Sequence, residues 1–75
     1  MQLPYIAPPW KMLKQKEIKD RVLAVMSIDN DFFAVSVFKD RCAEFTYSSF
    51  RKSDVIGKYK QLKNIIYKNN PESFC

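Results

Sequence analysis

Residues 22–48 read VLAVMSIDNDFFAVSVFKDRCAEFTYS, in which three apolar segments are separated by two short polar breaks. The segments at 22–28, 32–38 and 42–48 carry the continuous or alternating apolar patterns of β-strands. The two breaks are too short for a parallel crossover connection, which needs about a dozen residues or more. The sequence therefore predicts a three-stranded antiparallel β-meander over 22–48.

A helix is predicted to follow the meander, over residues 54–68. Ser53 stands at a favourable N-cap position, and Asp54 falls in the positively polarised first turn. Apolar residues then recur at helical spacing on one stripe, which consists of Val55, Tyr59, Leu62 and Ile66. The Asn-Asn-Pro sequence that follows ends the helix, and residues 69–75 form a tail.

The first 21 residues carry a weaker pattern. Three of the four prolines lie within residues 1–10, which predicts an extended, Pro-rich N-terminal arm. The charged stretch that follows is interpreted as a short helix over about residues 10–16, because proline suits the first turn of a helix. Residues 17–21 then lead into the first strand.

These elements predict a single small α+β domain over residues 1–75. It consists of a three-stranded antiparallel β-meander packed against one C-terminal α-helix, with the extended N-terminal arm in front of it. The predicted core combines sheet residues with the helix stripe: Val25, Val35, Val37, Phe45, Tyr47, Val55, Tyr59, Leu62 and Ile66.

The composition argues against an enzyme. The 75 residues include no histidine, the side chain most often used as a general base near neutral pH. The single glycine, Gly57, cannot build a glycine-rich phosphate loop. Two cysteines, Cys42 and Cys75, cannot complete a four-thiolate zinc site. We therefore expect no catalytic residues, no cofactor and no metal.

Neither a membrane span nor an export signal is expected. The longest apolar run covers residues 22–26, far short of the ~20 residues needed to cross a bilayer. The N-terminus lacks the basic and apolar regions of a secretory signal. These features predict a cytoplasmic protein that does not associate with membranes.

Large apolar residues exceed the needs of one small core. Phe32 and Phe38 are expected on the sheet face opposite the helix, where they require a cover. The arm, with Tyr5 and Trp10, could supply that cover, as could a second copy of the chain or a different protein. Phe74 in the tail is one more candidate anchor for a partner.

The net charge of +5 is concentrated near the C-terminus, since residues 51–75 hold 6 basic and 2 acidic side chains. The candidate basic contact residues are Arg51, Lys52, Lys60, Lys63 and Lys68. Such residues can neutralise phosphates, or they can simply keep a helix surface solvated. Lysine outnumbers arginine 10 to 3, which favours general attraction to phosphate over bidentate recognition of bases.

The sequence as a whole predicts a small, basic, non-enzymatic interaction module. The favoured interpretation is a protein-binding accessory subunit or inhibitor of a larger complex, which contacts a protein partner or a second copy through the surplus aromatic residues. The alternative is a nucleic-acid-binding protein. In that case the lysine-rich helix and the turn between the second and third strands, with Lys39 and Arg41, would contact phosphates.

Overall fold

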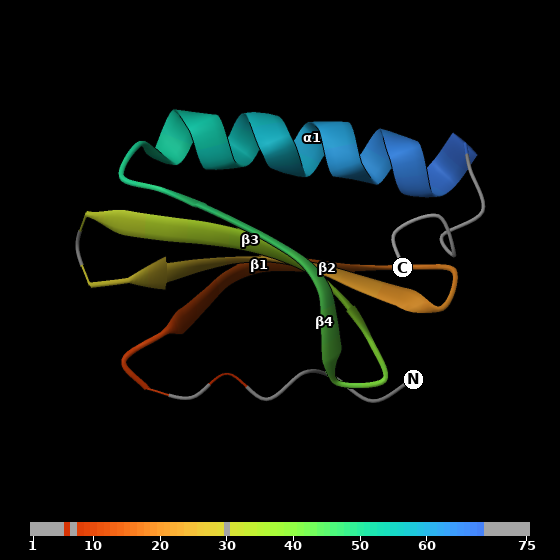
Figure 1. Ribbon diagram of the computed structural model, residues 1–75, viewed down its shortest axis with the longest axis horizontal. Coiled ribbons are helices and arrows are strands. Elements are labelled where there is room, and N and C mark those ends of the chain that lie inside the picture. Colours follow the sequence, from red (N-terminus) through yellow and green to blue (C-terminus); the bar gives the residue numbers. More distant parts are fainter. Residues whose placement is uncertain (1–5, 7, 30, 69–75) are drawn as a thin grey trace.

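The computed structural model describes residues 6, 8–29 and 31–68 of the chain. Within these ranges four antiparallel strands are followed by one helix (Figure 1). The elements are β1 (Lys11–Ile18), β2 (Arg21–Ile28), β3 (Phe32–Lys39), β4 (Cys42–Ser49) and α1 (Lys52–Lys68). The strand order is β1-β2-β3-β4, so every strand pairs with its neighbour in sequence, and α1 lies across one face of the sheet.

The α+β class, the three expected strands and the C-terminal helix are confirmed, although α1 begins at Lys52 rather than at residue 54. The expected number of strands was wrong. Residues 11–18, interpreted as helical over about 10–16, form the strand β1, which pairs with β2. Most residues of β1 are Lys, Gln, Glu, Leu or Met, which favour a helix in isolation. Pairing along the length of β2 outweighs this weak local preference.

The three hairpin connections use residues other than glycine in the left-handed backbone region. Asp40 and Arg41 between β3 and β4 both have positive φ, at 50° and 75°. Two consecutive residues of this kind are what a two-residue type I′ turn requires. Lys19 and Asp29 have φ values of 57° and 60° in the other two connections. The two polar breaks between the predicted strands therefore act as hairpin turns, as expected, whereas the turn at Lys19 was not expected.

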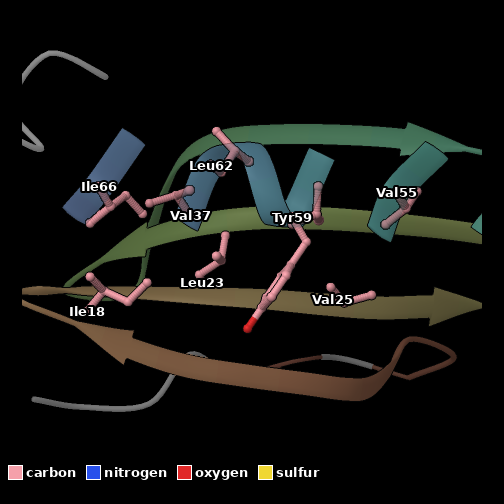
Figure 2. Close-up of a cluster of buried hydrophobic side chains, with 9 residues drawn as sticks. Ile18, Leu23, Val25, Val37, Val55, Tyr59, Leu62 and Ile66 are labelled. Atoms are coloured by element: carbon pink, nitrogen blue, oxygen red, sulfur yellow. The ribbon is translucent and has the colours of Figure 1, made fainter. Parts of the chain in front are cut away.

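The core lies between α1 and the sheet (Figure 2). All nine predicted core residues belong to it, with Phe45 and Tyr47 partly buried and the other seven fully buried. The structure adds Ile18 and Leu23 to this cluster. Full burial of one such side chain contributes about 1.5–3 kcal/mol, so the stripe of α1 is held firmly on the sheet.

The centre of the opposite face of the sheet is also buried, whereas Gln15, Glu17 and Thr46 on the edge strands are exposed there. Val22, Ala24 and Met26 of β2 expose 3% of their area or less. The segment leading into β1 lies on this side, away from α1 (Figure 1). Of the predicted arm only residues 6 and 8–10 are described, and the predicted tail at 69–75 lies outside the described residues.

A buried ion pair joins β2 to β4. Arg21 is 1% exposed, and its Nε donates a hydrogen bond of 2.8 Å to Oε2 of Glu44. A second guanidinium nitrogen donates to Oε1 of Glu44 at 3.2 Å, which makes the contact bidentate. The register of β3 and β4 shifts beside Val37, and Glu44 is the extra residue of β4 at that point. The β-bulge therefore positions the carboxylate for Arg21.

The ion pairs of Arg21 keep its guanidinium charged inside the fold. Burial alone would lower the pKa of Arg21, but the hydrogen bonds to Glu44 and Asp20 outweigh this effect and raise it. The hydrogen bond from Arg21 in turn lowers the pKa of the exposed Asp20 carboxyl below its ordinary value.

Replacement of two leucines tests the core. We expect Leu23→Ala to lower the free energy of unfolding by about 2–5 kcal/mol, because Leu23 is fully buried under α1. Leu13→Ala is the matched control, since Leu13 on β1 is 47% exposed, and it should cost less than about 0.5 kcal/mol. Urea denaturation monitored by circular dichroism measures both. Equal losses would contradict the assigned strand register.

A second pair of variants tests the buried ion pair. Glu44→Gln removes the negative charge but keeps the shape, which leaves Asp20 as the remaining carboxylate partner of Arg21 and should cost about 1.5–3 kcal/mol. Glu17→Gln, the same exchange at an exposed position of β1, should change stability by less than about 0.5 kcal/mol. If both variants unfold at the urea concentration of the unmodified protein, the ion pair does not stabilise the fold.

Candidate functional site

Three lysines of β1 share the side of the sheet that α1 covers. Lys14 lies opposite Val25 in the ladder of β1 and β2, and Lys16 lies opposite Leu23. Both partners belong to the core under α1. A β-bulge directly before Lys14 adds one residue to β1, which brings Lys11 onto the same side. The three lysines therefore follow one another along the edge of the sheet.

Two tyrosines of α1 meet these lysines. Tyr59 extends from α1 across the sheet (Figure 2), and Nζ of Lys14 lies 4.8 Å from the centroid of its ring. Nζ of Lys63, one helical turn further along, lies 5.9 Å from the same ring. Nζ of Lys16 lies 5.5 Å from the ring of Tyr67. A hydrogen bond with Tyr67 is the main cause that raises the pKa of Lys16.

We call this surface the basic seam. It comprises Lys11, Lys14 and Lys16 of β1, together with Tyr59, Lys60, Lys63 and Tyr67 of α1. Lys60 is included because, at about 100° per residue, it points within roughly 20° of Tyr67. All charged groups of the basic seam are lysines. Strand alternation places Glu17 on the other face of β1.

The positive charge of the seam is not neutralised within the described part of the chain. None of the lysines described there forms an ion pair with a carboxylate, whereas Arg21 has two such partners. Each contact between an ammonium group and an aromatic ring is worth about 0.5–1 kcal/mol at an exposed site. These contacts hold the ammonium groups of Lys14, Lys16 and Lys63 at the rings of Tyr59 and Tyr67, and such a cluster attracts a ligand with repeated negative charges.

The predicted apolar contact residues fall into separate places. Trp10 and Phe38 are both half-buried and line a cavity of about 240 Å³ on the sheet face opposite α1. Phe32 packs edge-on against Phe50, with ring centroids 4.8 Å apart. Tyr5 and Phe74 lie outside the described residues.

The cavity is mostly apolar. Its lining consists of Ile6, Trp10, Met26, Ser36, Phe38, Ala43 and Thr46. The hydroxyl groups of Ser36 and Thr46 are hydrogen-bonded to each other at 2.9 Å. Trp10 and Phe38 therefore border an apolar pocket between the N-terminal segment and its own sheet.

The predicted basic residues are likewise divided. Lys60 and Lys63 belong to the basic seam, as described above. Arg51 and Lys52 are exposed where α1 begins, and Lys68 is exposed where it ends. The turn between β3 and β4, expected to contact phosphates through Lys39 and Arg41, is not among the residues that form the seam.

Sequence reasoning missed the three lysines of β1, because residues 10–16 were interpreted as a helix. The bulge also interrupts the alternation by which residues on one face of a strand are recognised in a sequence. Lys11 and Lys14 are three positions apart, whereas neighbours on one face of a regular strand are two apart. Phe50 was missed as well. It is 76% exposed, and an isolated aromatic residue in the short loop before α1 is the signal that could have identified it.

The described residues offer little for other chemistry. No group of three or more potential metal ligands is found among residues 6, 8–29 and 31–68. In the same ranges, no helix has the length and apolar character needed to cross a membrane. Cys42 is an exposed free thiol.

No protein-family model matches the chain, and comparison with curated proteins and with solved structures likewise finds no significant match.

Proposed function

We propose that this protein is a non-enzymatic module that binds nucleic acid through the basic seam. The observation that carries the proposal is the cluster of lysines on β1 and α1. They are held beside two tyrosines, and no carboxylate pairs with them among the described residues. Lysines of this kind bind phosphate oxygens and release the counterions that surround the nucleic acid. The proposal includes the cytoplasmic location expected from the sequence.

The chemistry of the seam favours contact with the backbone rather than recognition of sequence. All its basic residues are lysines, which bind phosphate as point charges and lack the planar fork that arginine uses to recognise guanine. Lysine is positively charged at neutral pH because its ordinary pKa is about 10.4. The contact with Tyr67 raises the pKa of Lys16 further. We therefore expect binding that depends weakly on base sequence and strongly on salt concentration.

A protein partner is the second candidate, and Phe50 is the observation that favours it. An aromatic side chain with 76% exposure, packed on the ring of Phe32 and followed by Arg51 and Lys52, has the composition of an interface anchor. On the sheet face opposite α1, Val22, Ala24 and Met26 are already buried within the chain and offer no surface to a partner. For that reason the basic seam carries the proposal.

Salt-dependent binding tests the proposal. We expect the protein to bind a fluorescein-labelled oligonucleotide in about 50 mM salt, with an affinity that falls steeply as salt rises. The triple variant Lys14→Gln, Lys16→Gln, Lys63→Gln should bind at least about 10-fold more weakly at low salt. Its salt slope should decrease in magnitude by roughly 2, because three phosphate contacts are lost. Fluorescence anisotropy measures both quantities.

A charge-matched triple variant is the control. Lys39→Gln, Lys58→Gln, Lys68→Gln also removes three positive charges, but from positions outside the basic seam, and it should retain most of the affinity. Equal losses for the two triple variants would show a general charge effect and contradict the assignment to the seam. Absence of binding at about 50 mM salt would overturn the proposal. A protein partner would then be expected. The unmodified chain should capture it from nuclease-treated extract, and the Phe50→Ser variant should not.

A further inference from the structure

The backbone positions of the three lysines of β1 follow a regular repeat, because Lys11, Lys14 and Lys16 lie opposite every second residue of β2. Successive residues on one face of a strand are about 7 Å apart, and the bulge before Lys14 extends this repeat back to Lys11. A nucleic acid strand in an extended form presents its phosphates at a comparable interval. Lys11, Lys14 and Lys16 can therefore contact consecutive phosphates of one strand, with Lys60 and Lys63 alongside on α1.

Tyr67 offers a stacking surface beside the last of these lysines. Tyr59 is 2% exposed and cannot accept a base, whereas Tyr67 is 51% exposed. Tyr67 projects from the last turn of α1, next to Lys16. A base stacked on its ring would remain beside the ammonium group that holds the neighbouring phosphate.

We propose that the basic seam selects single-stranded over double-stranded nucleic acid, with the lysines of β1 on successive phosphates and one unpaired base stacked on Tyr67. This inference rests on the proposed function and specifies its ligand. Combination of a basic groove with an aromatic stacking platform is the general solution for binding single strands without sequence preference.

A duplex can make fewer contacts with the basic seam than a single strand can. Its bases are stacked inside the helix, so none is free to contact Tyr67. Recognition of a duplex through the major groove also needs side chains that form bidentate bonds with base edges, chiefly arginine, asparagine or glutamine on an inserted helix. The seam contains lysines and tyrosines only, and α1 lies along the sheet with its apolar stripe buried. Only the backbone contacts would remain for a duplex.

Competition between strand forms provides the test. The probe is a fluorescein-labelled DNA single strand of about 16 nucleotides, compared with the duplex of the same sequence in about 50 mM salt. We expect the single strand to bind at least about 10-fold more tightly. Tyr67→Leu should weaken single-strand binding by about 5-fold or more, because one stacked base is lost, and should leave the salt slope unchanged. Tyr67→Phe should retain the affinity of the unmodified protein.

Phe50→Leu is the matched control for loss of an exposed aromatic ring, and we expect it to bind like the unmodified protein. Equal or tighter binding of the duplex would overturn the single-strand inference and leave the proposed function intact. A Tyr67→Leu variant with full affinity and a folded circular dichroism spectrum would overturn the stacking contact. Absence of binding by both strand forms would overturn the proposed function itself, so the failures are distinguishable.

Discussion

Burial of the apolar stripe of α1 against the sheet is the interaction on which the rest of the structure depends. Val55, Tyr59, Leu62 and Ile66 are all at most 2% exposed, and their burial fixes the rotation of the helix about its axis. This rotation directs Lys63 and Tyr67 toward the edge formed by β1. It directs Lys58 toward the opposite edge, where its ammonium group lies 5.5 Å from two aromatic rings of β4.

Two β-bulges, one in each edge strand, determine where the charged side chains of these strands lie. The bulge in β4 supplies Glu44 to the buried guanidinium of Arg21, and the bulge in β1 aligns Lys11 with Lys14 and Lys16. Lysines on an edge strand also discourage pairing with other chains, which protects a small sheet protein from aggregation. The same residues can therefore protect the edge and attract phosphates. Protection of the edge needs only the charge of the lysines. The contacts of Lys14 and Lys16 with the tyrosines of α1 are the feature that favours a binding role in addition.

The sequence could predict those elements whose local pattern agrees with their tertiary environment. The strands that became β2 and β3 are apolar on both faces, and α1 has an uninterrupted stripe, so all three could be located with the core they form. In β1 the local preference opposes the final structure, because its lysine, glutamine and glutamate residues favour a helix. The seam could not be predicted for the same reason. Three of its five lysines lie on β1, and their positions depend on the register of β1, which pairing with β2 determines.

The central claim is that one continuous surface, between β1 and the C-terminal half of α1, binds nucleic acid. Titration of the isotope-labelled protein with a DNA single strand, followed by ¹H–¹⁵N correlation spectra, tests it most directly. We expect the shifting amides to cluster at Lys11–Ile18 and around Lys63 and Tyr67, with little change at the turn formed by Asp40 and Arg41. Shifts confined to that turn or to the neighbourhood of Phe50, with β1 unaffected, would contradict the account.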